Sequence, residues 1–354
     1  MGGFLTDNFN IGFLADLKLL ALVFALLVFF FLKYVLTLHV YVLLFILIVL
    51  YYTNQFYNRE SSEKVYNMLN DRTNKPIKVC VVGTGFAGIC MGVHLKKANI
   101  PFVMFEKSLD IGGTWWDNKY PGCACDVWTP IYQFSFCRNP NWSQFVAPAK
   151  EIQLYLKKVV LEFGLEKHIK LNTKILRAEW QEPSKSWCIE TEDVDKTKLN
   201  FTHIVSGCGA LRSPILPNIP GVDSFQGKSF HSQHWDSTYD YKGKRVAIIG
   251  SAASAVQIAP AIAEEVKELF IFQRTPNWHV KKVNPVYPQW LKSIFRHFPF
   301  VMRLMGIFIF NLLEFNRFLM FRTGWASSLL KVSFWIQINK SLKRSWIGFV
   351  QIYP

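Results

Sequence analysis

The sequence has few acidic residues, and its cysteines form no pattern that binds zinc or a redox dithiol. Of its 354 residues, 25 are Asp or Glu and 40 are Lys or Arg, which gives a formal net charge of +15. The seven cysteines include no C-x-x-C pair, and the nearest two, Cys123 and Cys125, are separated by one residue. These absences argue against a zinc site, a disulfide framework and a disulfide reductase. Reduced thiols in a cytosolic setting, with no bound metal, are predicted instead.

The shortage of acids favours an anionic partner, and the residues beside the basic ones indicate which kind. From residue 284 to the end there are nine Lys or Arg and one acid, Glu314, among many Phe and Trp. Basic residues among large apolar ones are typical of a membrane surface rather than of nucleic acid binding. Segment 284–354 is therefore predicted to be helical and to contact membrane lipids, or to pack around an active site with its basic residues in solvent. The two interpretations are compatible, and no oligomeric state is predicted.

Residues 19–52 are almost entirely apolar, and Lys33 and His39 are among the few interruptions. A bilayer core needs ~20 apolar residues, whereas this run as one helix would be about 50 Å long. One crossing after an interfacial helix is favoured over a hairpin, because the sequence around Lys33 offers no Gly, Pro or Asn. A cleaved signal peptide is disfavoured, because the first 17 residues contain no Lys or Arg. We predict a membrane anchor over 1–52 and a linker over 53–76, with the following domain in the cytosol, at the endoplasmic reticulum.

The first soluble segment has the pattern of a dinucleotide-binding unit. Residues 77–82 are apolar and β-branched, and a G-x-G-x-x-G pattern follows at Gly83, Gly85 and Gly88 before a helical stretch. A second strand ends in Glu106, about where an acid can bind ribose hydroxyls. Acid at this position favours an unphosphorylated ribose, as in FAD or NAD.

A second unit begins at residue 244, after a proline-rich boundary near Pro214 and Pro220. A strand over 245–249 leads into Gly250, but Ala252 stands where the second glycine of the pattern is expected. The extra methyl group is expected to crowd a pyrophosphate. The next strand ends near Arg274, which favours the 2′-phosphate of NADPH, although an arginine merely solvated at a strand end is the alternative.

Two further motifs resemble those of flavin-dependent Baeyer–Villiger monooxygenases. The first covers 112–126 and the second, F-x-G-x-x-x-H-x-x-x-W-D, covers 225–236. Their matching positions are Gly113, Trp115, Tyr120, Pro121, Gly122 and Asp126 in the first, and Phe225, Gly227, His231 and Trp235 in the second. The resemblance implies an α/β fold with two Rossmann-like domains, which we place at 77–215 for FAD and 216–283 for NADPH, and a helical insertion.

The resemblance also implies an activity and a set of site residues. NADPH would reduce FAD, and a C4a-peroxyflavin formed with O2 would insert oxygen into a small carbonyl compound or oxygenate nitrogen or sulfur. Asp126 would act beside the flavin, and His231 would couple the movement of the two domains. The FAD contacts would be Gly83, Gly85, Phe86, Ala87, Gly88, Glu106, Gly113, Thr114, Trp115, Asp126 and Tyr132. The NADPH contacts would be Gly250, Ser251, Ser254, Ala255, Arg274 and Thr275.

One part of the family pattern is not found. The family carries a catalytic arginine in a Lys-Arg pair after the helical insertion, but the surroundings of Lys343 and Arg344 do not match it. A shortened isoform or an incomplete gene is therefore expected, with the last part of the flavin domain missing. A catalytically inactive, membrane-bound nucleotide-binding remnant remains the alternative to a membrane-anchored monooxygenase.

Overall fold

The computed structural model describes residues 76–192, 198–211, 213–275, 283–321 and 349–351. All of them belong to one compact unit, Ser62–Pro354. The predicted anchor over 1–52 and almost all of the linker over 53–76 lie outside the described residues.

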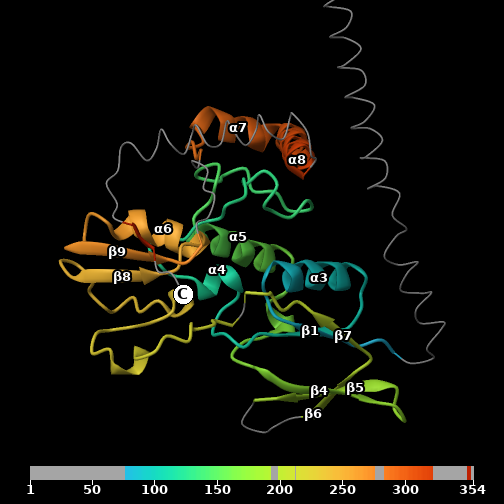
Figure 1. The fold of residues 1–354 in the computed structure, drawn as a ribbon. Coiled ribbons are helices and arrows are strands. Elements are labelled where there is room, and N and C mark those ends of the chain that lie inside the picture. The colour runs from blue at the N-terminus through green and yellow to red at the C-terminus, as the bar shows by residue number, and fades with distance from the viewer. Residues whose placement is uncertain (1–75, 193–197, 212, 276–282, 322–348, 352–354) are drawn as a thin grey trace, which may run out of the picture. The chain divides into compact units, whose positions relative to one another are not determined.

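The first sheet contains four parallel strands in the order β3-β2-β1-β7. Their bounds are Ile169–Lys170 for β3, Phe102–Phe105 for β2, Val79–Val82 for β1 and His203–Ser206 for β7. Helix α3 (Phe86–Lys97) connects β1 to β2, as the sequence predicted (Figure 1). The strand β1 reads as a continuous apolar run because a parallel sheet is buried on both faces.

Alternate residues of β1 face two different cores. Val79 and Val81 pack in the larger cluster with residues of α3 and α5 (Ala149–Glu162). Cys80 packs on the opposite face with Ile189 and Phe201. Those two residues belong to an antiparallel sheet of β4 (Ile175–Gln181), β5 (Ser186–Thr191) and β6 (Lys198–Phe201), inserted between β3 and β7. Helices therefore cover one face of the first sheet and a second sheet covers the other (Figure 1).

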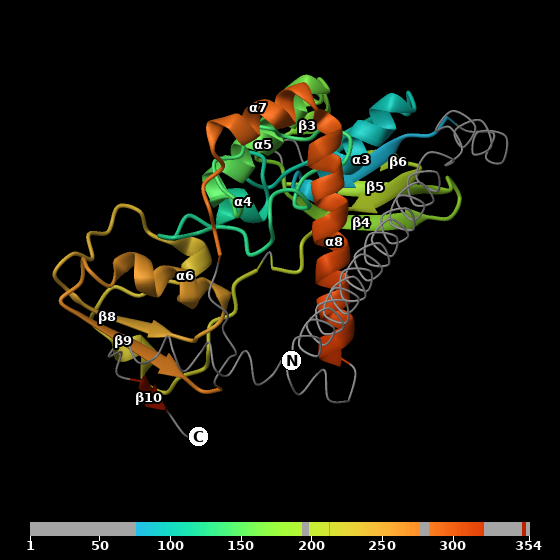
Figure 2. The same ribbon diagram turned by 90° about the horizontal axis from the view of Figure 1, so that it is seen from above.

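The second unit has a smaller parallel sheet in the order β10-β9-β8. Strand β8 (Arg245–Ile249), helix α6 (Ala253–Ile262) and strand β9 (Glu268–Gln273) form a β-α-β unit (Figures 1 and 2). The third strand, β10 (Phe349–Gln351), pairs with β9. This strand differs from the prediction that 284–354 is helical, because the free edge of β9 offers unpaired backbone groups to any extended segment.

Two helices follow the second unit within the described part of segment 284–354. Helix α7 (Gln289–His297) and helix α8 (Pro299–Phe321) meet at Phe298, whose backbone is not helical, and the pair is bent by 107° (Figure 2). Within the part of the chain that the structure describes, no single helix is long and apolar enough to cross a membrane. The bent pair of α7 and the first part of α8 passes that test of length and composition when taken together.

Candidate functional site

The first glycine loop needs glycine at two of the three positions of the pattern, Gly83 and Gly88. Gly83 has a φ of +92°, which glycine adopts at little cost. A Cβ on Gly88 would lie 1.9 Å from the carbonyl oxygen of Gly83, closer than two non-bonded heavy atoms can approach. The loop therefore packs backbone against backbone, and the N-terminus of α3 opens directly after Gly85.

Glu106 is buried, with 5% of its surface exposed, and its carboxylate is bound to the same loop. Its Oε2 atom accepts hydrogen bonds from the backbone N–H of Thr84 at 2.9 Å and from the Thr84 hydroxyl at 2.8 Å. Its Oε1 atom accepts from the N–H of Ser108 at 3.0 Å. The acid predicted to bind ribose thus also holds the loop in shape. Thr84 was not predicted, although a hydroxyl residue between the first two glycines, 22 residues before an acid, was visible in the sequence.

The second glycine pair packs directly on the first. The N–H of Gly112 donates to the carbonyl oxygen of Thr84 at 3.1 Å. Gly113 has a φ of +55°, and a Cβ built on it would lie 3.1 Å from the Cα of Gly85. The structure therefore brings two predicted glycine loops together, and the short helix α4 (Thr114–Asp117) starts at their junction.

Three aromatic residues of the predicted FAD site form one cluster. The indole N–H of Trp115 donates to the Tyr132 hydroxyl at 3.2 Å, and the two rings are 5.6 Å apart. Phe86 packs edge-on to Tyr132 at 5.0 Å. Burial raises the pKa of Tyr132 to about 12, so this hydroxyl stays protonated at neutral pH. Ala87 and Thr114 are exposed at the same loops.

Asp126 is exposed and follows the buried Cys125. Its charge adds to the effect of burial in raising the pKa of two tyrosines, Tyr120 and Tyr132, to about 12. The predicted catalytic carboxylate is therefore within electrostatic reach of both the aromatic cluster and Tyr120, a residue of the same motif.

The loop of the second unit has the same backbone conformation as the first. Ala252 has φ −77° and ψ −172°, and Gly85 at the matching position has φ −78° and ψ −168°. Gly250 has a φ of +108°, as Gly83 has a positive φ. The alanine therefore costs no backbone strain, since neither position requires glycine for its dihedral angles.

The other predicted NADPH residues lie around this loop and at the end of β9. Ser251 and Ser254 are half-buried, and Ala255 is buried. Arg274 and Thr275 are exposed just after β9. The structure thus places the arginine at the same end of the sheet as the glycine turn, where ligands bind in open α/β sheets.

His231 has a local structural role in the part of the chain that the structure describes. Its Nδ1 atom accepts a hydrogen bond from the N–H of Gln233 at 3.1 Å and caps a 3₁₀ helix, Ser232–His234. Trp235 then packs with Tyr120, Ile258 and Ile262 in one apolar cluster. Tyr120 belongs to the first motif and Ile258 to α6, so Trp235 of the second motif joins the first motif to the second unit. Among the described residues, no group of three His, Cys, Asp or Glu is arranged to hold a metal.

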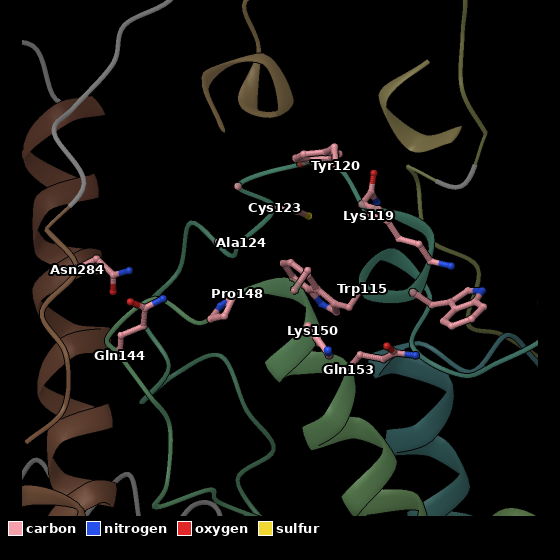
Figure 3. A pocket seen from close by; sticks show the side chains of 14 residues that line it. Trp115, Lys119, Tyr120, Cys123, Ala124, Gln144, Pro148, Lys150, Gln153 and Asn284 are labelled. Atoms are coloured by element: carbon pink, nitrogen blue, oxygen red, sulfur yellow. The ribbon is translucent and has the colours of Figure 1, made fainter. Parts of the chain in front are cut away.

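A cavity of about 640 Å³ lies beside the first motif (Figure 3). The first motif contributes Trp115, Lys119, Tyr120 and Cys123 to its lining, and the start of α5 contributes Lys150. This cavity is open to solvent, and both aromatic and polar side chains of the first motif line it.

Comparison with known proteins identifies the family of this chain. A family profile described as flavin-binding monooxygenase-like matches residues 76–320. The chain belongs to this family. The resemblance stated from the two motifs is thereby confirmed for the flavin monooxygenase family.

Two relatives of this flavin-binding monooxygenase-like chain are named as Baeyer–Villiger monooxygenases. One from Pseudomonas aeruginosa is 42% identical over 238 residues, which cover 67% of this chain and 45% of that protein. One from Streptomyces coelicolor is 39% identical over 236 residues, 66% of this chain and 45% of that protein. The chain therefore spans about half the length of the curated relatives that it matches.

Solved structures agree with the α/β prediction. OTEMO in complex with FAD and NADP has a TM-score of 0.59 at 31% identity, over 64% of this chain and 44% of that one. Cyclohexanone monooxygenase with bound epsilon-caprolactone has a TM-score of 0.58 at 28% identity, over 62% and 44%. These similarities support the α/β fold, and they do not test the predicted membrane anchor.

Proposed function

We propose that this chain is the FAD- and NADPH-binding portion of a monooxygenase that inserts one oxygen atom from O2 into a small carbonyl compound. One observation carries the proposal. The first motif packs on the glycine loop of one nucleotide unit through Gly113 and Gly85, and on α6 of the other unit through Gly122 and Gln257. Hydride transfer between two dinucleotides requires their rings to be positioned against each other, and a segment packed on both units can position them.

The residues present fit FAD in the first unit. Glycine at positions 83, 85 and 88 leaves bare backbone at the N-terminus of α3, where pyrophosphate oxygens can accept hydrogen bonds. Each carboxylate oxygen can accept more than one hydrogen bond, so Glu106 can bind a ribose hydroxyl while it holds Thr84. When bound, FAD supplies electron transfer from NADPH and the activation of oxygen.

The chain's own residues position and shield the reacting groups. Phe86, Trp115 and Tyr132 give the site an apolar wall that excludes water. Asp126 places a negative charge at the edge of this wall and can orient a cationic partner. The names of the relatives favour a carbonyl substrate over oxygenation of nitrogen or sulfur, which remains the second candidate within the same chemistry.

The test is the visible absorbance of the detergent-purified 354-residue chain before and after NADPH is added without oxygen. A flavin band that bleaches is the expected result. A well-folded chain, judged by circular dichroism, without any flavin band would contradict the proposal and favour a non-catalytic nucleotide-binding protein. Turnover of a cyclic ketone, compared with turnover of a thioether, then separates carbonyl insertion from heteroatom oxygenation.

The same proposal includes attachment to membrane lipids, with residues 77 onward in the cytosol at the endoplasmic reticulum. Its support is the apolar run over 19–52 and the basic residues Arg59, Lys64, Arg72 and Lys75 after it. The full chain should stay in membranes during carbonate extraction, and its nucleotide units should be open to added protease. A double variant, Leu44→Arg with Leu47→Arg, should be released, because each central charge costs about 2.5–3.5 kcal/mol. Release of the unaltered chain would contradict the attachment.

A further inference from the structure

The first motif ends in a small antiparallel ribbon that two distant side chains hold at its edges. The N–H of Cys125 donates to the carbonyl oxygen of Ala147 at 3.0 Å, and the N–H of Ala149 donates to that of Cys123 at 2.9 Å. In such a ribbon the intervening residues turn their N–H and C=O groups outward. Those outward groups need partners, because among the described residues neither Ala124 nor Val146 has a backbone hydrogen-bond partner.

A glutamine of α6 binds the outward groups of Ala124. The Gln257 Nε2 atom donates to the carbonyl oxygen of Ala124 at 2.9 Å, and its Oε1 atom accepts from the N–H of Ala124 at 3.3 Å. The Tyr120 hydroxyl donates to the same Oε1 atom at 3.1 Å. The Gln257 side chain therefore pairs with Ala124 as the backbone of a neighbouring strand would, and it also binds Tyr120 of the same motif.

An asparagine holds the opposite edge in the same way. The N–H of Val146 donates to Oδ1 of Asn284 at 2.6 Å, and Nδ2 of Asn284 donates to the carbonyl oxygen of Val146 at 3.2 Å. Asn284 also lies among the residues that line the cavity (Figure 3). Both edges of the ribbon are thus bound by amides that come from α6 or from the segment before α7.

The backbone around Gln257 fits the motif closely. A Cβ on Gly122 would lie 2.5 Å from the carbonyl oxygen of Gln257, so only glycine allows this approach. Gln257 lies one helical turn after Ala253, where α6 begins at the second glycine loop. Asp126 follows Ala124 by two residues, so the contact joins the second nucleotide loop to the predicted catalytic carboxylate.

We propose that Gln257 is a positioning residue that holds the Ala124 edge, and through it Asp126, to the helix that binds the second nucleotide. The inference rests on the proposed function. Binding of NADPH at the start of α6 then fixes the segment from Ala124 to Asp126 beside the flavin. Loss of the Gln257 amide should leave NADPH binding nearly unchanged and slow electron transfer to the flavin. An amide is required, since only it offers a donor and an acceptor in the arrangement of a peptide group.

The test compares Gln257→Leu, Gln257→Glu and Gln226→Leu in the detergent-purified full chain. Gln226 is exposed, and its side chain donates to the carbonyl oxygen of Ser224 two residues away at 3.0 Å, a local contact that makes it the matched control. The measurements are flavin content, bleaching by dithionite, and the rate constant and half-saturating concentration of anaerobic bleaching by NADPH. Hydrogen exchange at the Ala124 amide, with and without NADP+, reports the contact without turnover.

Gln257→Leu should retain flavin and bleach normally with dithionite, while its maximal rate with NADPH falls by at least about tenfold, as expected for displaced reacting groups. The half-saturating NADPH concentration should change much less, and exchange at Ala124 should quicken and lose its response to NADP+. Gln257→Glu keeps the acceptor and loses the donor, so its rate should be intermediate.

A Gln257→Leu chain that reduces its flavin at the unaltered rate would overturn the inference, as would an equal loss in Gln226→Leu. If the leucine variant lacks flavin, the glutamate variant decides, and an unaltered rate in it overturns the inference. Failure of the proposed function is distinguishable, because the unaltered chain would then show no flavin band at all.

Discussion

Glu106 binds Thr84 twice, through the Thr84 backbone N–H at 2.9 Å and through the Thr84 hydroxyl at 2.8 Å, and both bonds reach the same carboxylate oxygen. The other oxygen accepts from Ser108. The acid at the end of β2 therefore fixes the glycine loop that ends β1, before any ligand is considered.

The first prediction concerns this carboxylate. Glu106→Gln has nearly the same shape, but its amide nitrogen donates and cannot accept a hydrogen bond. At least one buried N–H or hydroxyl then loses its partner, which should lower the free energy of unfolding by about 1–3 kcal/mol. Denaturant unfolding measures the loss, and flavin absorbance should fall with it. Glu192→Gln is the control, because Glu192 is exposed and its ion pair with Lys174 at 3.9 Å should contribute less than about 1 kcal/mol. Equal losses in the two variants would contradict the argument.

The second prediction concerns Gly88. A methyl group there would overlap the Gly83 carbonyl oxygen at 1.9 Å, so Gly88→Ala must displace the loop or α3. Overpacking of this kind costs about 1–3 kcal/mol or more and should abolish the flavin band of the purified chain. Gly209→Ala is the matched control, since a Cβ at Gly209 meets nothing within 4 Å and Gly209 has no positive φ. A Gly88→Ala chain with the stability and flavin content of Gly209→Ala would refute the packing argument.

The sequence could predict what depends on neighbouring residues. The glycines of the first loop, strands β1 and β2 and helix α3 follow from local pattern and backbone geometry. The contacts between residues far apart in the sequence could not be predicted. Gln257 and Asn284 bind residues 133 and 138 positions earlier, and nothing in the sequence around them indicates these partners. That the Ala252 methyl group crowds a pyrophosphate stays a prediction, and the backbone of Ala252 matches that of Gly85 and shows no strain.

The third prediction concerns alkaline pH. Burial raises the pKa of Tyr120, Tyr132 and Tyr287 from 10.0 to about 12, and that of the Cys80 thiol from 9.0 to about 12. Between these values the unfolded chain releases protons that the folded chain keeps, so stability falls as pH rises. Below about pH 8 these groups give almost no pH dependence, because they are protonated in both the folded and the unfolded state.

The measurement is the denaturant midpoint of the chain at several pH values from 8 to 11. From about pH 8 the midpoint should decline, first through Cys80 and above about pH 9 through the tyrosines as well, while absorbance near 295 nm reports tyrosine ionisation. Tyr287→Phe removes one buried phenol and should make the decline shallower, although it also loses the 3.2 Å contact with the Thr129 hydroxyl. A midpoint that rises with pH, or an unchanged slope in Tyr287→Phe, would contradict the sign assigned here.

The fourth prediction concerns the choice of nicotinamide cofactor. Arg274 is exposed just beyond the last residue of β9, at the end of the sheet where Gly250 makes its turn. A guanidinium there can bind a 2′-phosphate through two parallel hydrogen bonds. Arg274→Ala should therefore raise the half-saturating NADPH concentration for flavin bleaching by about 10- to 100-fold, the effect of losing hydrogen bonds to a charged group. The value for NADH, which lacks the phosphate, should change little.

Arg245 provides the control for Arg274, because it is equally basic and exposed but begins β8, in register with Glu268 at the start of β9. Strands rise about 3.3 Å per residue, so the two arginines lie roughly 20 Å apart at opposite ends of the sheet. Arg245→Ala removes the same charge and should leave the preference for NADPH intact. If both variants weaken NADPH binding equally, net charge and not a phosphate contact sets the preference for NADPH over NADH. If neither does, the arginine at the end of β9 is only solvated, and NADPH selection must reside elsewhere in the protein.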